Sequence, residues 1–402
     1  MNFFLKISFL ILLLCSFALA QEEDKASPSL EEKNIEKEED KAADENKPEE
    51  KQEEKATEEK PSEENKATEE KATEENKATE QQEEKVVLKN YGLPDELWDK
   101  CSYTCDEEEI LDMTTDYWCA LNAVDQAKYA RMYQEGYAKN KNLEIEKIAT
   151  VSEANFEMRL VPPGRFWIGS EDKEKGRNPY NEYSCRIVLS KPYYMCKYEI
   201  TQGQWKAVMG NNPSFFQKSK NHPVEQVAWE EHCKGFCEKT EMSLPTEAQW
   251  EYACRSGVYG MSYIGDFDIS GDNNAPALGS IAWYSGNSSG KTNPVGKKEP
   301  NAWGFHDMLG NVWEWCEDAC YYVAGNVMTK TYKDDIADPK SVDSSMERRI
   351  YRGGSWDSIP RACRAATRNG NAPAFKNNKL GFRCIKEHSA FVKKSEEKKT
   401  EE

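Results

Sequence analysis

The sequence predicts a loop-rich α+β domain over residues 151–386, behind a long polar segment. After Val151, short apolar runs alternate with Gly, Pro and Asn, and tryptophans occur throughout. Such punctuation is typical of short strands, turns and ordered loops rather than of long helices. The formal net charge of -18 is concentrated before this region. The chain therefore divides by composition into a leader, an acidic spacer, a small extension, the main domain and a charged tail over residues 387–402.

The first twenty residues, MNFFLKISFLILLLCSFALA, have one Lys, a long apolar run, and Ala-Leu-Ala before Gln21. This pattern predicts a secretory signal peptide that is cleaved after residue 20. A retained anchor is the alternative, but the apolar stretch is short for a bilayer span. Lipidation at Cys15 is disfavoured, because Leu14 is bulkier than the small residue that usually precedes a lipidated cysteine. We expect an exported protein that is periplasmic, secreted or on the cell surface, with no transmembrane segment in the mature chain.

Residues 21–85 hold 26 Asp and Glu against 12 Lys, and repeat units such as KATEEK and NKATEE. A segment so poor in apolar side chains cannot offset the entropy lost on ordering, which predicts a disordered low-complexity spacer. A solvated single helix is the alternative, because Glu, Ala and Lys favour helix. No nucleic-acid partner is expected for this acidic chain.

Residues 86–150 are polar with an intermittent apolar stripe, which predicts a small helical extension. In the main domain, MRLVPPGRFWIGS predicts two strands around a Pro-Pro-Gly turn, and CRIVLSKPYYMCKYEIT predicts a hairpin. HPVEQVAWEEHCKGFCEKT predicts a turn and then a helix, and LPTEAQWEYACRSG predicts a helix that Thr246 caps.

Of the thirteen cysteines, Cys15 lies in the leader, and an exported chain with twelve others is typical of disulfide-linked proteins. Zinc is disfavoured because no Cys-x-x-Cys occurs and the four His are scattered. Cys185 and Cys196 flank the predicted hairpin and are candidates for a cross-strand bond. Cys316 and Cys320, four apart on a predicted helical face, are not expected to bridge to each other. Partners for the other cysteines stay open: Cys101, Cys105, Cys119 and Cys233.

Seven blocks in order resemble the formylglycine-generating enzyme, or sulfatase-modifying factor, family. They are MRLVPPGRFWIGS, YEITQGQW, HPVEQVAW, LPTEAQWEYACR, NAWGFHDMLGNVWEWCED, YRGGSW and LGFRC, between about 155 and 386. The resemblance implies that family's loop-rich fold, which is related to C-type lectin-like domains. Active members oxidise a cysteine in a Cys-x-Pro-x-Arg motif to formylglycine with oxygen and a copper ion held by two cysteines.

The resemblance also shows where this chain departs from the enzymes. The first copper-binding cysteine lies three residues beyond the serine of the Gly-Gly-Ser-aromatic block, and Ser358 occupies that position here. Since Cu(I) selects thiolates, copper is not expected. Counting five residues further gives Cys363, but the loop is shorter than in catalytic members. Lys379 also stands where catalytic members have an asparagine before Leu-Gly-Phe.

Two disulfides are implied by the resemblance, from Cys237 to Cys384 and from Cys254 to Cys363. The resemblance also implies a structural calcium site, with Asp307 and Glu314 supplying carboxylates and Gly310 and Val312 supplying carbonyls, a donor set that suits a hard cation. A turn at Gly310 with no ion is the alternative.

Three functions follow as hypotheses. A non-catalytic module is favoured, in which the former active-site pocket recognises an unknown protein, peptide or carbohydrate ligand. An oxidoreductase of the parent type, or with another metal, is the second, and a structural envelope protein is the third. The candidate ligand-binding residues combine an aromatic platform, an acceptor and cationic donors: Trp356, Asp357, Ser358, Arg361, Arg364, Arg368 and Lys379. Internal salt bridges are the competing role for Arg364 and Arg383.

Overall fold

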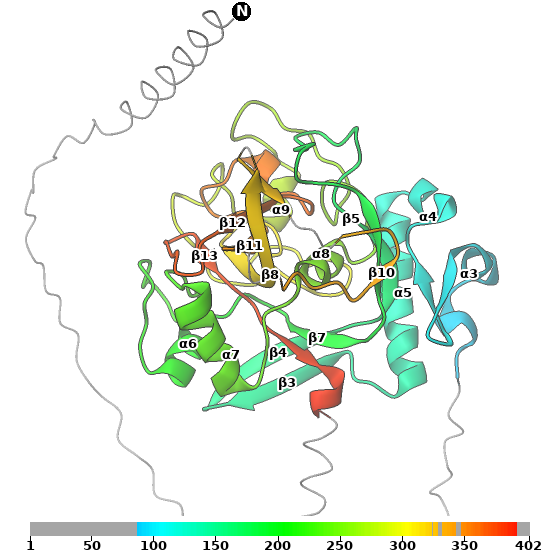
Figure 1. Cartoon of the computed structure of the whole chain (residues 1–402), viewed down its shortest axis with the longest axis horizontal. Helices are drawn as coiled ribbons and strands as arrows, with labels where there is room; N and C mark the ends of the chain where they lie inside the picture. The colour runs from blue at the N-terminus through cyan, green and yellow to red at the C-terminus, as the bar shows by residue number, and fades with distance from the viewer. Residues whose placement is uncertain (1–86, 324, 329–331, 343–346, 392–402) are drawn as a thin grey trace, which may run out of the picture. The chain divides into compact units, whose positions relative to one another are not determined.

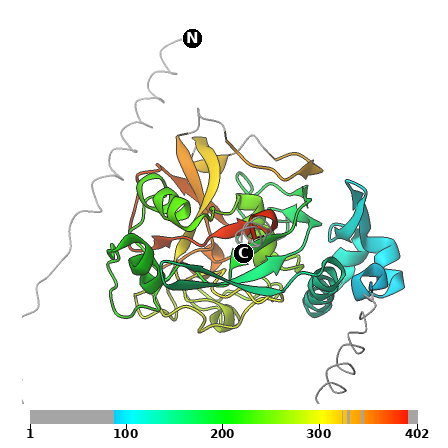
Figure 2. The same ribbon diagram turned by 90° about the horizontal axis from the view of Figure 1, so that it is seen from below.

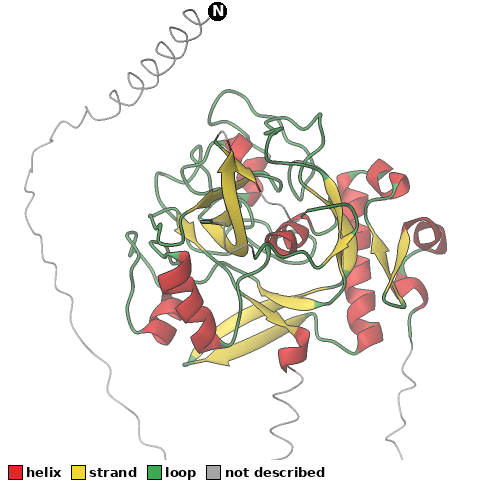
Figure 3. Ribbon diagram, viewed as in Figure 1, coloured by secondary structure: helices red, strands yellow, loops and turns green. Residues whose placement is uncertain are grey.

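The computed structural model describes residues 87–391, except 324, 329–331 and 343–346 (Figure 1). The predicted signal peptide, the acidic spacer and residues 392–402 of the tail lie outside these ranges. All described residues fall in one compact unit, Glu83–Glu402. Within them the chain forms mixed helices and short strands joined by long loops (Figure 3), which confirms the α+β, loop-rich class. No helix in the described ranges is both long and apolar enough to cross a membrane.

The strands form three sheets in the part of the chain that is described. The first has the order β1-β2-β5-β6-β10, with β1 Ser102–Cys105, β2 Glu108–Asp112, β5 Gly164–Ile168, β6 Cys185–Leu189 and β10 Ile336–Ala337. The second has the order β12-β11-β8-β13, with β9 also on β8; its strands are β8 Trp313–Val323, β9 Asn326–Met328, β11 Arg348–Arg352, β12 Arg368–Asn371 and β13 Leu380–Gly381. The third has the order β14-β7-β4-β3, with β3 Glu146–Val151, β4 Ala154–Val161, β7 Tyr193–Cys196 and β14 Ile385–Glu387.

The two strands predicted around the Pro-Pro-Gly turn are confirmed as β4 and β5. The predicted hairpin is wrong. β6 pairs with β5, whereas β7 pairs with β4, so the chain passes from one sheet to another between Leu189 and Tyr193. Since Cys185 and Cys196 therefore lie in different sheets, the cross-strand bond expected between them is also wrong.

The helices are short apart from α5, and their bounds are η1 Lys89–Gly92, α3 Asp95–Cys101, α4 Asp116–Ala120, α5 Ala123–Lys141, α6 Gln202–Met209, η2 Trp229–Cys233, α7 Lys234–Thr240, α8 Glu247–Arg255, α9 Leu278–Ile281 and η3 Pro360–Ala362. The helix predicted after HPVEQVA is thus split into the π-helical turn η2 and α7.

The segment before the main domain contains the expected helices, but it also has strands. Strands β1 and β2 form a hairpin, and β2 joins the first sheet by parallel pairing with β5. Trp118 of the apolar stripe is fully buried, whereas Val124 is 78% exposed. In both views α3, α4 and α5 lie at one edge of the domain (Figure 1, Figure 2).

Helix α8 lies at the centre of the fold in Figure 1 and packs on β5, β8 and β11. As predicted, Thr246 begins it: its hydroxyl accepts the amide of Gln249, and the Gln249 side chain accepts the amide of Thr246. This reciprocal cap satisfies two backbone donors that the helix itself cannot. It allows a helix buried on nearly every side to begin without an unpaired amide at these positions.

Buried indoles tie the loops to the core. The ring nitrogens of Trp118, Trp303 and Trp315 each donate to a backbone carbonyl more than 80 residues away, at 2.9–3.0 Å. All three side chains are fully buried. A buried N–H without a partner is costly. Each hydrogen bond therefore favours the one backbone arrangement in which the distant carbonyl reaches the indole.

All twelve described cysteines are unbridged in this structure. The sulfurs of Cys237 and Cys384 lie 3.9 Å apart, so the two side chains are in contact, but the distance exceeds that of an S–S bond, which is about 2.05 Å. Cys254 and Cys363 are both fully buried thiols. The two bridges that the resemblance implies therefore stay predictions. Cys316 and Cys320 lie on strand β8 rather than on a helix, and four residues of strand separate them by about 13 Å.

Candidate functional site

The loop between β11 and β12 forms the centre of the candidate site. Gly353 and Gly354 begin it, with φ of 98° and 80°. A Cβ at Gly354 would lie 2.8 Å from the Cys363 sulfur, and one at Gly353 would lie 2.9 Å from the Met308 carbonyl oxygen. Both the left-handed backbone and the close contacts require glycine here. The glycine pair thus places Ser355 directly over the core.

Ser358, which the resemblance puts at the position of the first copper-binding cysteine of the enzymes, is fixed by Ser355. The Ser355 amide donates to Ser358 Oγ at 3.0 Å, and the two hydroxyl oxygens are also 3.0 Å apart. The Ser355 hydroxyl donates to Asp357 Oδ1 at 2.8 Å. The hydroxyl of Ser358 is therefore part of a local turn. The Asp357 carboxylate reaches Ser358 only through the Ser355 hydroxyl, so none of these contacts brings an acid or base directly to the Ser358 hydroxyl.

Cys363 is close to the same serine, because the Ser355 amide also contacts its sulfur. The thiol is fully buried, and burial raises its pKa to about 12. Since the thiolate is the form that binds metals and reacts, this cysteine is held in its inert form at neutral pH. Ser358 and Cys363 therefore both lie beside Ser355. Ser358 offers a hydroxyl there, and Cys363 offers a neutral thiol.

Trp356 forms a mixed aromatic and charged surface with its neighbours. Its ring nitrogen donates to the Asn378 carbonyl at 2.9 Å, and the ring packs edge-on against Phe216 with centroids 5.4 Å apart. Phe215 contacts Phe216 in the same manner at 5.0 Å and is 66% exposed. Lys379 lies 5.9 Å above the Trp356 ring.

Asp357 and Lys379 form an ion pair beside this ring. The Asp357 side chain also accepts a hydrogen bond from the Ser355 hydroxyl, so the buried Ser355 fixes the orientation of the ion pair. We call Phe215, Phe216, Trp356, Asp357 and Lys379 the Trp356 surface. Sequence reasoning missed the two phenylalanines; the adjacent aromatics in NNPSFFQKSK were the signal that could have found them.

The three arginines predicted for ligand binding are separated by the structure. Arg361 is exposed and lines a recess of about 210 Å³ together with Ile359. Arg364 is 1% exposed and binds Glu174 and Glu182, with two contacts of 2.7–2.9 Å to Glu182. The prediction that Arg364 binds a ligand is therefore corrected, because its donors are used inside the domain.

Arg368 is corrected in the same way. Its side chain is 8% exposed, and it pairs with the buried Glu247 and donates to the Asn181 carbonyl. Arg383, the other arginine with a competing structural role, is fully buried and binds both oxygens of Glu314 at 2.7 Å. The internal salt bridges weighed for Arg364 and Arg383 are present.

Three of the residues predicted to bind calcium, Asp307, Gly310 and Val312, lie in one tight turn, and Glu314 lies at the start of the following strand β8. Asp307, Gly310 and Asn311 all have positive φ, and a Cβ at Gly310 would lie 2.2 Å from a carbonyl oxygen of Trp283. Val312 donates its amide to the buried Glu199 at 3.1 Å. The turn predicted at Gly310 is therefore present, and its geometry is set by contacts within the protein.

The two predicted carboxylate ligands differ in how well they suit a cation. Asp307 Oδ1 is buried without a hydrogen-bond partner, and burial raises the Asp307 pKa to about 6. A cation at this oxygen would relieve that cost. Glu314 does not suit it, because Arg383 and the Trp250 ring nitrogen already occupy both oxygens. Within the described ranges, no cluster of three or more His, Cys, Asp or Glu side chains has metal-binding geometry.

Comparison with known proteins decides the family. The model of the sulfatase-modifying factor enzyme 1-like domain matches residues 144–388, more than half of the chain. The chain belongs to the sulfatase-modifying factor family. Mouse formylglycine-generating enzyme is 28% identical over 223 residues, which cover 50% of this chain and 53% of that protein. The chaperone protein LppX of Paenibacillus barcinonensis is 31% identical over 191 residues, covering 34% and 65%.

This sulfatase-modifying factor protein thus spans only about half to two thirds of these relatives. Among solved structures, Treponema denticola variable protein 1 is 28% identical with a TM-score of 0.49, over 60% of this chain and 99% of that one. PvdO from Pseudomonas aeruginosa is 26% identical with a TM-score of 0.48, over the same shares.

Proposed function

We propose that this exported member of the sulfatase-modifying factor family is a non-catalytic recognition protein. The observation that carries the proposal is Ser358. A hydroxyl stands where the enzymes have a thiol, and it is hydrogen-bonded to Ser355 rather than to an activating base. Without that thiol the oxidation of a substrate cysteine lacks its first metal ligand.

The remaining groups also fit copper poorly. Cys363 is a buried neutral thiol with a pKa of about 12, and a serine hydroxyl is a hard, weak ligand for Cu(I). A copper site would therefore need one ligand that is absent and one that must ionise in an apolar environment.

The Trp356 surface is the best candidate for recognition. Phe215 offers exposed apolar area and packs on Phe216, which in turn packs on Trp356. The ion pair of Asp357 with Lys379 supplies one acceptor and one donor. Aromatic anchors beside oriented charges are typical of protein and peptide recognition. We therefore favour a peptide or protein ligand over a carbohydrate, because the Trp356 ring nitrogen is already bound to Asn378.

The test is binding to a peptide microarray by the mature protein and by the variant Phe215→Ala. Phe215 is largely exposed, so its loss should leave folding intact while it removes an anchor. We expect binding to fall about tenfold or more. Tyr180→Ala is the matched control, since Tyr180 is 64% exposed and lies outside the Trp356 surface. Equal binding by all three proteins, or binding to a glycan array alone, would contradict a peptide-binding Trp356 surface.

A second candidate is an oxidoreductase that generates formylglycine, the product in the name of the mouse relative. One observation favours it, namely that Cys363 lies beside Ser355 and leaves one sulfur in the position of the family's active site.

We also propose that the protein is exported, because of the predicted signal peptide. We further propose that Asp307 binds a calcium ion, because its Oδ1 oxygen is buried without a hydrogen-bond partner. In that arrangement Glu314 stays with Arg383 instead of binding the ion.

A further inference from the structure

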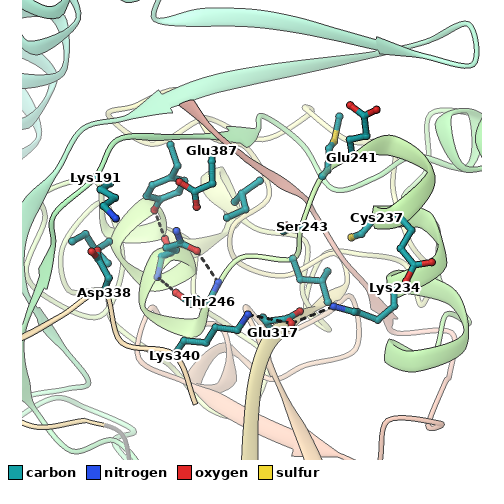
Figure 4. A pocket seen from close by; sticks show the side chains of 17 residues that line it. Lys191, Lys234, Cys237, Glu241, Ser243, Thr246, Glu317, Asp338, Lys340 and Glu387 are labelled. Carbon is teal, nitrogen blue, oxygen red and sulfur yellow. Dashed lines mark hydrogen bonds and ion pairs between the residues drawn. The ribbon is translucent and has the colours of Figure 1, made fainter. Parts of the chain in front are cut away.

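A wide recess of about 550 Å³ shares no residue with the Trp356 surface, but its charges do not select a ligand (Figure 4). Lys234 and Lys340 both lie 3.3 Å from the same oxygen of Glu317. Glu238 and Glu241 line the same side, so charges of both signs are mixed there. A second, much smaller cavity has lining atoms that do define a ligand.

The second cavity has a volume of about 10 Å³ and lies within a network of buried ion pairs. Helix α8, the end of β11, the start of β12 and the loop after β5 contribute to its walls. Its volume is at the lower limit of what one water molecule requires, and it is too small for an organic ligand.

Four buried polar atoms of the lining residues lack a hydrogen-bond partner within the described ranges: Asn181 Oδ1, Glu247 Oε1, Arg352 Nε and Arg368 Nε. Asn181, Glu247 and Arg352 are at most 7% exposed, and the Arg368 side chain is 8% exposed. Arg352 Nε and Glu247 Oε1 lie 3.3 Å apart as an ion pair, but without the geometry of a hydrogen bond. Buried polar atoms almost always have a partner, so four such atoms around one cavity indicate a ligand that they share.

The side chains that carry these atoms are fixed by their other contacts. Arg352 Nη1 donates to the carbonyls of Ala366 and Thr367 at 2.7 and 2.6 Å. Glu247 Oε2 accepts the Tyr332 hydroxyl at 2.8 Å. Rotation of either side chain toward another partner would break these hydrogen bonds. The positions of the unpaired atoms are therefore set by the fold.

The network around the cavity has no net charge for a ligand to neutralise. Asp318 accepts the Glu247 amide, but it does not line the cavity, and burial raises its pKa to about 7. The ion pairs connect four carboxylates with four guanidinium groups, namely Glu174, Glu182, Glu247 and Glu251 with Arg255, Arg352, Arg364 and Arg368. A neutral ligand is therefore favoured over an ion.

The unpaired atoms comprise two donors and two acceptors. An anion in the cavity would lie against the Glu247 carboxylate, and a cation would lie against two guanidinium groups. A water molecule can accept from both donors and donate to both acceptors. We propose that this cavity binds one water molecule, which accepts from Arg352 Nε and Arg368 Nε and donates to Glu247 Oε1 and Asn181 Oδ1.

This water is a structural ligand that joins separate parts of the fold. Asn181 lies in the loop between β5 and β6, and Glu247 begins α8. Arg352 and Arg368 lie opposite each other on β11 and β12. The water thus links a loop of the first sheet to the central helix and to the second sheet. The inference is independent of the Trp356 surface and of the proposed function.

The first test is a crystal structure of the mature protein at a resolution that shows ordered water. We expect one density peak within about 3.2 Å of at least three of the four unpaired atoms. The absence of a peak there would overturn the proposal. An anomalous peak at that position in crystals grown with bromide would also overturn it, because it would identify an anion.

The second test uses the arginine Nε–H signals in solution. A water held in the cavity should give rotating-frame cross-relaxation peaks to the Nε–H groups of Arg352 and Arg368, with the sign that marks direct contact rather than proton exchange. Arg255 is the matched control, because its Nε–H is also buried but donates to Glu251 at 2.9 Å, so it should give no such peak. Equal peaks from all three arginines, or none from Arg352 and Arg368, would contradict the proposal.

Discussion

Replacement of Arg364 by Met tests whether this arginine belongs to the scaffold or to the recognition surface. Its guanidinium binds Glu182 through two nitrogens, also binds Glu174, and donates to the Gly176 carbonyl at 2.9 Å. Its side chain is 2% exposed, and the two carboxylates are 2% and 5% exposed. Removal of the arginine leaves the buried Glu182 without its partner and Glu174 with the charge of Arg255 alone.

The cost should be about 3–5 kcal/mol in the free energy of unfolding, as for other buried pairs that lose one partner. Urea denaturation followed by tryptophan fluorescence measures it. Arg361→Met is the matched control, because Arg361 is exposed, and it should change the free energy by less than about 0.5 kcal/mol.

The pH dependence gives a second readout of the same change. Burial acts to raise the Glu182 pKa, but hydrogen bonds and charge from Arg364 lower it overall, whereas burial raises that of Glu174. Glu182 therefore adds stability above its unfolded pKa of about 4.3, and that stability is lost as pH falls. In Arg364→Met both carboxyls resist ionisation, so the deficit should be larger at pH 8 than at pH 5. Equal stability of the two arginine variants would refute the internal role of Arg364.

Two further changes probe buried carboxyls. Burial and Glu247 raise the Asp318 pKa to about 7, above an unfolded value of about 3.9, so stability should fall by about 3 kcal/mol as pH rises from 4 to 7. Asp318→Asn should flatten that slope in urea titrations, and an unchanged slope would contradict it. Calcium should raise the melting temperature relative to chelator by ordinary linkage, and Asp307→Ala should abolish the shift. A parent protein that melts identically in both would exclude the ion.

Local sequence signals predicted those elements that depend on local chemistry. The cap at Thr246 needs only residues within one turn, and the Pro-Pro-Gly turn separates β4 from β5. The hairpin failed because adjacency along the chain does not decide which sheet a strand joins. β6 and β7 flank a short turn, yet each pairs with a strand from the earlier part of the domain.

The site was predictable where it followed the family spacing and not where it depended on distant partners. Counting from the glycine pair drew attention to Ser358, which lies beside Ser355; Cys363 also lies beside Ser355, although the resemblance assigns it to a disulfide with Cys254. The partners of Arg364 lie more than 180 residues earlier, and nothing in the loop itself indicates that its guanidinium turns inward. Phe215 was missed for the same reason, since only the fold brings it near Trp356.

The central claim is that Ser358 has replaced the thiol chemistry of the family. It is tested most directly by incubating the mature protein with copper, oxygen and a Cys-x-Pro-x-Arg peptide, followed by mass spectrometry of the peptide. We expect that no formylglycine aldehyde forms, while an active family member converts the same peptide. Appearance of the aldehyde with this protein would contradict the account, because it would show that catalysis proceeds without a thiol at position 358.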